Sequence, residues 1–144
     1  MILVFHKITF FSALLLFSLP YFAQEKLNDG HKKFYYENGV VSSEGEIKNG
    51  KPEGYWKTYY PTGILKSDGN RKNYLLDSTW VFYNERGDTI QKINYKANKK
   101  HGIKTLFSSK CNIILEENFE NDIKQGYTIH YYDTLLFDSV AKIK

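Results

Sequence analysis

The sequence predicts an all-β protein, an elongated antiparallel meander of stacked β-hairpins built from 24-residue repeats. One register of small residues recurs every 24 positions, at Gly30, Gly54, Ser78, Gly102 and Gly126. Short aromatic runs lie between glycine, asparagine and aspartate residues, which is typical of strands and turns. A fixed period of this length indicates one small supersecondary unit stacked several times, and it favours a binding or scaffolding surface over a catalytic globule.

Residues 1–23 have the layout of a secretory signal peptide that precedes a repeat domain over 24–144. Lys7 is followed by an apolar run over 8–19, and Ala23 offers a small residue for cleavage. The alternative is an uncleaved anchor, although the run is short for a membrane span of about 20 residues. We therefore expect an exported protein in the periplasm, the cell envelope or the extracellular space.

The charge pattern favours a mixed, solvated surface. The formal net charge is +4 and falls to +3 when Lys7 is removed with the first 23 residues. Lysines and acids are interspersed, as over 44–48, so no basic block indicates a nucleic-acid partner.

The single cysteine, Cys111, cannot form an internal disulfide, so the fold must be stable without one. Cys111 occupies the turn position that holds Gly39, Gly63 and Gly87 in earlier copies. We interpret it as a drifted turn residue. A reactive or intermolecular thiol is the alternative.

Each repeat is expected to contain two strands and two turns. Four full copies run over 30–53, 54–77, 78–101 and 102–125, and a partial fifth runs over 126–144. The first turn is a three-residue loop that ends in glycine, because glycine adopts the left-handed backbone region without steric cost. The second turn carries Asn49-Gly50 in the first copy, and we expect a distorted or longer turn over 72–77, where that glycine is lost.

The three-residue loop fixes a strand register. It pairs an aromatic residue with an apolar or β-branched residue in every copy: Tyr35–Val41, Tyr59–Leu65, Tyr83–Thr89, Phe107–Ile113 and Tyr131–Phe137. We predict that this column is the core. The same register predicts that Tyr55 lies opposite Gly69 and His31 opposite Gly45.

The opposite face is the candidate interaction surface. It is predicted to carry Tyr36, Trp56, Tyr60, Trp80 and Phe82. Aromatic residues with a polar rim are typical of recognition surfaces. The alternative for the two tryptophans is that they pack as a second layer or cover adjacent hairpins.

No catalytic, cofactor or metal site is predicted. The histidines His31, His101 and His130 fall at different repeat positions and form no short-spaced ligand pair. Adjacent acids such as Glu116 and Glu117 point to opposite faces of a strand, so they do not form a catalytic pair. The sequence contains no nucleophile motif and no phosphate-binding glycine loop.

The repeat resembles the MORN repeat variant family. The matching pattern is Gly-x-Trp-x-x-Tyr-Tyr-x-x-Gly-x-Leu-x-Ser-x-Gly, which is nearly whole over 54–69. The first copy departs from it with Lys32 in place of tryptophan, and the third has Ser78 and Ile93 in place of glycines. The resemblance implies a hairpin-repeat sheet used for protein or membrane contact, and some similar proteins are labelled antitoxins.

The leading functional hypothesis is a non-enzymatic exported module for protein–protein interaction or scaffolding at the cell envelope. No motif in the sequence identifies the partner protein. One alternative is association with a membrane surface through lysines and aromatic residues, and another is an antitoxin-like protein. A third is an enzyme acting on a glycan or peptide, which would need paired carboxylates converging on a groove.

Overall fold

The structure, a computed structural model, describes residues 27–109 and 112–132. These residues contain nine strands: β1 (Gly30–Tyr35), β2 (Val41–Lys48), β3 (Lys51–Tyr59), β4 (Leu65–Lys72), β5 (Leu75–Tyr83), β6 (Thr89–Lys96), β7 (Lys99–Phe107), β8 (Ile113–Glu120) and β9 (Ile123–His130). Over the same residues there is no helix that is long and apolar enough to cross a membrane. The predicted signal peptide, Cys111 and Phe137 lie outside the described residues.

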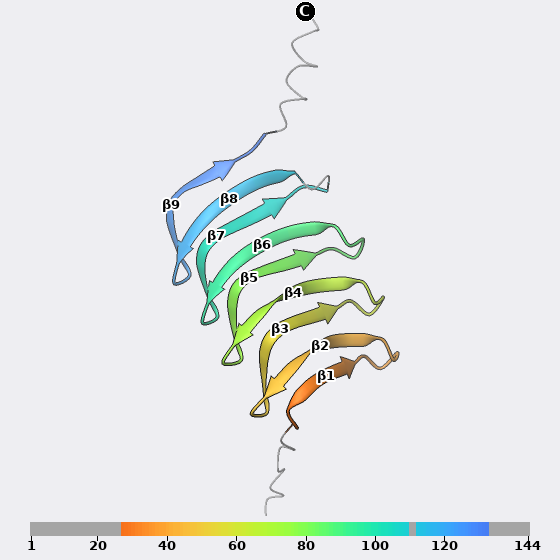
Figure 1. The fold of residues 1–144 in the computed structure, drawn as a ribbon. Helices are drawn as coiled ribbons and strands as arrows, with labels where there is room; N and C mark the ends of the chain where they lie inside the picture. The colour runs from red at the N-terminus through yellow and green to blue at the C-terminus, as the bar shows by residue number, and fades with distance from the viewer. Residues whose placement is uncertain (1–26, 110–111, 133–144) are drawn as a thin grey trace, which may run out of the picture.

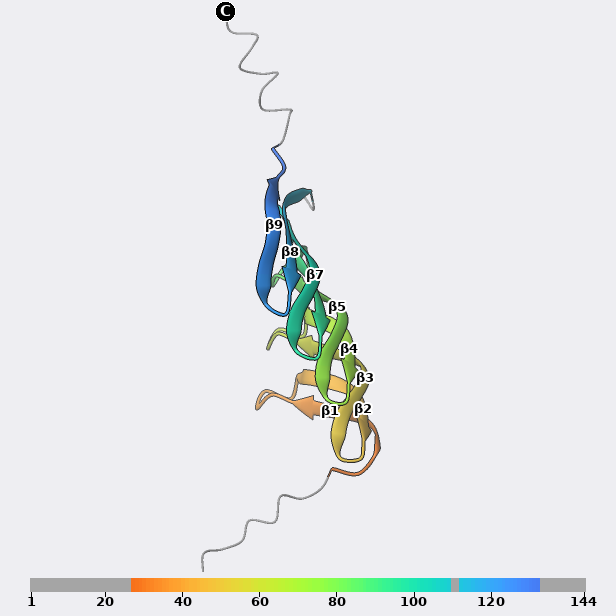
Figure 2. The ribbon, with the colours of Figure 1, turned by 90° about the vertical axis from the view of Figure 1, so that its left-hand side faces the viewer.

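The nine strands form one open sheet in which each strand pairs with the next strand along the chain. The order is β1 to β9 without a crossover, and every pairing is antiparallel. Figure 1 shows the curved hairpins side by side, and Figure 2 shows them rising as one stack from β1 to β9. The predicted all-β meander is confirmed.

The three-residue loops have the predicted geometry. In the first loop, Tyr36 N donates to Val40 O at 2.8 Å and Gly39 N donates to Tyr36 O at 2.9 Å. Gly39 has φ +81°, which explains the need for glycine. The same two bonds recur in the next two loops, where Gly63 and Gly87 take the place of Gly39.

The first four predicted pairs beside the loops are confirmed, but the register beyond them is not. Tyr35 pairs with Val41 and Tyr59 with Leu65, as predicted, and the register then shifts by one residue. The shift is a β-bulge, which leaves Ser42 in the first hairpin without an opposing residue. The equivalent residues in the next three hairpins are Lys66, Ile90 and Ile114.

The bulge makes two predicted pairs wrong. Gly69 lies opposite Trp56 instead of Tyr55. Gly45 lies opposite Lys32 instead of His31. Because side chains alternate between faces, one inserted residue exchanges the faces of the residues that follow.

The two-residue turns are alike in all copies, so the longer turn predicted over 72–77 is wrong. Asn49 and Gly50 have φ values of 53° and 72°, and Asn73 and Tyr74 have values of 51° and 63°. Two positive φ values in succession are the geometry that suits the twist of a two-residue hairpin. The second copy therefore keeps the turn and places a tyrosine in the left-handed region.

The recurring small residue of the repeat marks a bend in the odd-numbered strands from β3 to β9. Gly54 has φ +69°, and β3 has two more residues than β2 between the pairs Gly45–Trp56 and Glu46–Glu53. Ser78 occupies the equivalent bend in β5 with φ 59°. Figure 1 shows the resulting curvature, which turns one face of the sheet inward.

The core lies on the face opposite to the predicted one. The buried hydrophobic side chains among the described residues are Ile47, Trp56, Trp80, Ile93 and Phe119. Tyr35, predicted as core, is 60% exposed, and Tyr131 is 43% exposed. The physical reason is the bulge, which sets each tryptophan against a glycine, where the flat indole fits without a competing side chain.

Candidate interaction face

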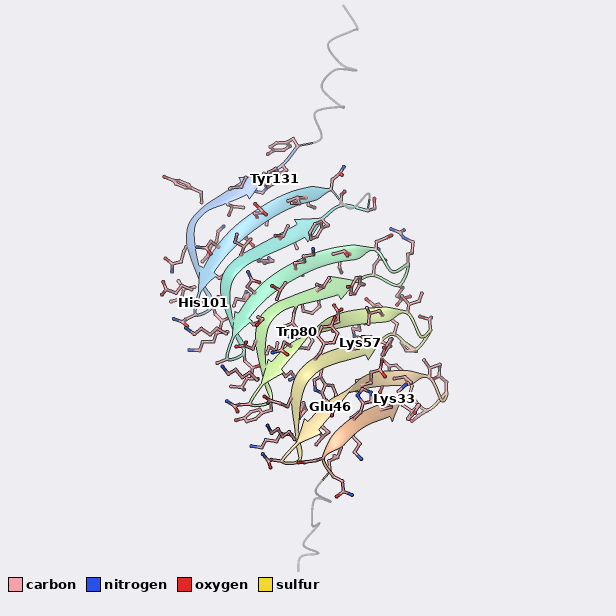
Figure 3. All side chains as sticks on the ribbon, viewed as in Figure 1. Lys33, Glu46, Lys57, Trp80, His101 and Tyr131 are labelled. Atoms are coloured by element: carbon pink, nitrogen blue, oxygen red, sulfur yellow. The ribbon has the colours of Figure 1, made fainter. Side chains whose placement is uncertain are left out.

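The aromatic column predicted as core is a half-exposed surface, here called the tyrosine face. It carries Tyr35, Tyr59, Tyr83, Phe107 and Tyr131. Figure 3 shows Lys33 near the N-terminal end of this sheet and Tyr131 at its C-terminal end. The tyrosine face therefore extends over the length of the described sheet.

Carboxylates and tyrosine hydroxyls pair along this face at a separation of 15 residues. Tyr59 Oη donates to Glu44 Oε1 at 2.5 Å, and Tyr83 Oη donates to Asp68 Oδ1 at 3.3 Å. Near the C-terminal end, Tyr131 Oη donates to Glu116 Oε2 at 2.7 Å. Each pair joins one hairpin to the next, so the hydrogen bonds hold neighbouring repeats together.

One pair of this series has a different residue type at both positions. Lys92 and Phe107 occupy the positions of the acid and the tyrosine, and Lys92 Nζ lies 5.5 Å from the centroid of the Phe107 ring. A cation over an aromatic ring replaces the hydrogen bond of a hydroxyl to a carboxylate. The spacing is thus kept while the charge changes sign.

Glu44 is the most heavily engaged carboxylate on the tyrosine face. The Tyr59 hydroxyl is the main cause that lowers the pKa of Glu44 from 4.5 to about 2, and Lys33 contributes further. Lys33 Nζ lies 3.3 Å from Glu44 Oε2. His31 lies between two acids, with Nε2 3.5 Å from Glu44 Oε2 and Nδ1 3.2 Å from Glu46 Oε1.

Asp68 is shared by two tyrosines. Tyr55 and Tyr83 both donate their hydroxyls to it. The hydrogen bond to Asp68 is the main cause that raises the pKa of Tyr55 to about 12. Burial is the main cause that raises the pKa of Tyr83. Both phenols are therefore protonated donors at neutral pH.

Two shallow grooves meet on the tyrosine face at Glu44. One has a volume of about 310 Å³ and is lined by His31, Glu44, Glu46, Tyr55 and Lys57. The other has a volume of about 300 Å³ and is lined by Lys33, Val40, Val41, Glu44, Tyr59 and Gly63. Acids, bases and exposed tyrosine rings thus lie within one surface of β1 to β4.

The two tryptophans predicted on the interaction face are buried. Trp56 is 6% exposed and Trp80 is 3% exposed. Trp80 Nε1 donates to Asn70 O at 2.9 Å, and the Trp56 ring stacks on Phe34 with centroids 6.2 Å apart. This confirms the alternative that the tryptophans pack against adjacent hairpins.

The other three predicted residues have roles between repeats. Tyr36 Oη donates to Tyr59 O at 2.6 Å, and Tyr60 Oη donates to Tyr83 O at 2.8 Å. Phe82 packs against the buried cluster of tryptophans. The structure thus brings all five residues into the packing of the sheet, and contact of Tyr36, Tyr60 or Phe82 with a partner stays a prediction.

Sequence reasoning missed the carboxylates of the tyrosine face. Their signal was present as acids 15 residues before an aromatic residue, at Glu44, Asp68 and Glu116. The signal could be recognised only after the bulge was known, because a register without the bulge turns these acids to the other face.

A second feature is a row of lysines along the edge of two-residue turns. These exposed residues are Lys48, Lys51, Lys72, Lys96 and Lys99. A groove of about 470 Å³ lies between the first two turns and is lined by Lys48, Asn49, Lys51, Glu53, Asn73 and Tyr74. Lys51 Nζ lies 4.4 Å from the centroid of the Tyr74 ring. We call this set of lysines the lysine edge.

Across residues 27–109 and 112–132, no group of three or more His, Cys, Asp or Glu side chains is placed to hold a metal ion. His31, Glu44 and Glu46 come together in the groove described above, where the imidazole lies 3.5 Å from Glu44 Oε2 and 3.2 Å from Glu46 Oε1.

Comparison with known families identifies the first two hairpins. The MORN repeat variant matches at residues 28–49, which span β1 and β2, and at residues 52–73, which span most of β3 and all of β4. No curated protein and no solved structure matches the chain. The first two hairpins therefore match the MORN repeat variant, as the motif over 54–69 predicted, and the hairpin geometry continues from them through β9.

Proposed function

We propose that this chain is a non-enzymatic module that binds another protein through the tyrosine face, at the part formed by β1 to β4. The observation that carries the proposal is the pair of grooves that meet at Glu44. Tyr35 and Tyr55 are 60% and 55% exposed on this surface. Exposed tyrosines beside acids and bases offer apolar contact area together with hydrogen-bonding groups, which is typical of recognition surfaces.

The state of Glu44 supports binding over acid–base catalysis. A general acid or base works best when its pKa lies near the operating pH. The pKa of Glu44 is about 2, because Tyr59 and Lys33 favour its charged form. Such a carboxylate stays ionised and paired at neutral pH, so it suits a fixed acceptor in a contact surface.

We propose that the protein acts after export from the cytoplasm. The signal-peptide pattern of residues 1–23 supports this part of the proposal. Fractionation of cells that express the full chain tests it. Recovery outside the cytoplasm, with an intact mass that begins at Gln24, is the expected result. A cytoplasmic chain of full length would contradict export.

A pulldown from cell-envelope extract tests partner binding. The Tyr35→Ala plus Tyr55→Ala variant should lose a partner that the unmodified chain retains. A matched control, Tyr74→Ala plus Tyr132→Ala, removes two exposed tyrosines that line neither of the two grooves at Glu44, and it should keep that partner. Equal retention by both variants, with circular dichroism unchanged, would count against this surface.

Membrane-surface association through the lysine edge is the second candidate. Lysines near an anionic lipid surface contribute about 1 kcal/mol each, and salt screens the attraction. Vesicles with anionic lipid should float the chain at low salt and release it at high salt. The Lys48→Gln plus Lys51→Gln variant should float less well, whereas Lys33→Gln plus Lys57→Gln, on the other surface, should not change flotation. No flotation with any lipid would end this candidate.

A further inference from the structure

The groove between the β2–β3 turn and the β4–β5 turn contains a residue that the turn geometry disfavours. Figure 1 shows these turns side by side at one edge of the sheet, and the groove between them has a volume of about 470 Å³. Tyr74 lines this groove and has φ 63°. The same turn position holds Gly50, Asn98 and Asp122 in the other copies, and these residue types adopt positive φ more readily than an aromatic residue does. The chain thus carries backbone strain at Tyr74 that the equivalent turns reduce.

Contacts within the chain compensate only weakly for this strain. Tyr74 is 46% exposed, so much of its ring is in contact with solvent. Its backbone carbonyl accepts a hydrogen bond from Arg71 Nη1 at 2.8 Å, which a residue of any type could accept. The ring itself contacts Lys51, whose Nζ lies 4.4 Å from the ring centroid, and a cation–π contact at an exposed site is weak. Because strained residues cluster at ligand-binding sites, a ligand that packs on the ring would explain a tyrosine at this position.

The charged groups of the groove favour an anion. Lys48 and Lys51 bring two ammonium groups to it, and Glu53 brings one carboxylate. Glu53 Oε2 already accepts a hydrogen bond from the backbone nitrogen of Asn73 at 2.7 Å. The two lysines therefore outnumber an acid whose carboxylate is partly satisfied by the chain itself.

Two asparagine side chains add neutral hydrogen-bonding groups to the same groove. Asn49 and Asn73 both line it, and each side-chain amide offers donors as well as an acceptor. An aromatic ring can pack on the apolar face of a sugar ring, amides can bind its hydroxyls, and ammonium groups can bind an attached acid. The combination of Tyr74, the two amides and the two lysines therefore matches a sugar that carries an acidic group.

We propose that the groove at Tyr74 binds one residue of an anionic sugar, a hexose that carries a carboxylate or a phosphate group. Its volume lies within the range of about 300–1,000 Å³ that is usual for small-molecule sites. The site is independent of the partner-binding proposal, because none of its lining residues lines the two grooves at Glu44. It shares Lys48 and Lys51 with the membrane candidate, but it also requires Tyr74 and needs no lipid.

Titration of the full chain with glucuronate and with glucose 6-phosphate, followed by amide chemical shifts, tests the ligand class. The shifts should concentrate at residues 48–53 and 72–75, with a Kd of about 1 mM for so small a ligand. Glucose and inorganic phosphate each carry only part of the required chemistry and should bind at least about 10-fold more weakly. Binding of one anionic sugar alone would support the proposal and identify the acidic group. Inorganic phosphate that binds as tightly as either anionic sugar, or no localised shifts with both sugars, would overturn it.

Three variants separate binding from folding. Tyr74→Gly keeps both lysines and places in the turn a residue suited to positive φ, so the chain should stay folded while binding of the anionic sugar weakens at least about 10-fold. Lys51→Gln should also weaken binding, by an amount that shrinks as salt is added. The matched control, Lys99→Gln, changes the equivalent lysine of the third turn, where Asn98 replaces the tyrosine, and should leave binding unchanged. Unchanged binding by Tyr74→Gly, or an equal loss in the control, would refute the site.

Discussion

The Tyr59 hydroxyl donates a hydrogen bond of 2.5 Å to Glu44 across neighbouring hairpins. The bond ties the second repeat to the first on the tyrosine face. Its equivalents, Tyr83 with Asp68 and Tyr131 with Glu116, do the same further along the sheet. A one-layer sheet with a small core thus gains contacts between repeats from its partly exposed face.

This bond predicts a loss of stability in acid. The pKa of Glu44 is about 2 in the folded chain and 4.5 ordinarily, so the unfolded chain binds a proton at a higher pH than the folded chain does. Stability from Glu44 is therefore complete above about pH 5 and is lost as the pH falls through the folded pKa. Allowing for partial solvent screening, we expect a loss of about 1–2 kcal/mol in the free energy of unfolding.

Substitution of the donor tests the cause. Tyr59→Phe should lower the free energy of unfolding by about 1–2 kcal/mol at pH 7, because it removes a hydrogen bond to a charged group. The difference from the unmodified chain should shrink towards zero near pH 2, where Glu44 becomes protonated. Urea titrations across this range measure it, with Tyr35→Phe, an exposed residue on the same face, as control. A difference that does not change with pH would contradict the assignment.

The exchanged pair Lys92 and Phe107 predicts a coupling between two substitutions. Lys92→Glu alone leaves an acid without a hydroxyl donor, and Phe107→Tyr alone directs a hydroxyl towards a lysine. Together they recreate the pair seen at Glu44 and Tyr59. We expect the double variant to be more stable than the sum of the single effects by about 0.5–1.5 kcal/mol. Additive effects in a double-mutant cycle by urea unfolding would show that the two positions do not interact.

Gly69 is expected to be intolerant of a side chain. A Cβ atom there would lie 2.4 Å from Cγ of Trp80, well inside contact distance. Gly69→Ala should therefore lower the free energy of unfolding by about 2–3 kcal/mol through overpacking. The same change in a Trp80→Ala background should cost much less, because the indole is absent. An equal cost in both backgrounds, measured by thermal or urea unfolding, would assign the effect to the backbone alone.

The two-residue turns predict opposite effects at equivalent positions. Tyr74 has φ 63°, a region that costs a residue with a side chain about 1 kcal/mol. Tyr74→Gly should stabilise the chain by up to about 1 kcal/mol, reduced by the lost contact between its ring and Lys51. Gly50→Tyr, at the same position of the first turn, should destabilise it. Equal signs for the two changes in thermal unfolding would contradict the turn assignment.

The parts of the fold that could be predicted are those set by local contacts. The loop glycine at 39 fixes the pair Tyr35–Val41, and the repeat carries the same local chemistry to each following hairpin. The bulge at Ser42 could not be predicted, because no residue type is required there: its equivalents are lysine and isoleucine. The turn at Asn73 and Tyr74 was missed because the adjoining hairpins hold its geometry despite the unfavourable residue.

The candidate face could likewise be predicted only in the part that local contacts determine. The sequence showed that two columns of aromatic residues lie on opposite faces of the sheet. It could not show which of the two columns is buried. The buried column is the one whose tryptophans lie over Gly45 and Gly69, and that match depends on a one-residue shift between neighbouring strands. The acids of the exposed face could be recognised only with this shift in place.

By itself, the sequence determined the 24-residue unit, its loops and the hairpin pairs beside them, because backbone conformation and cross-strand pairing act over a few residues. Only the tertiary structure decided that Trp56 and Trp80 lie inside and that Tyr35 lies outside. The reason is that side chains alternate with every residue of a strand, so one bulge in each hairpin reverses the face on which the core forms.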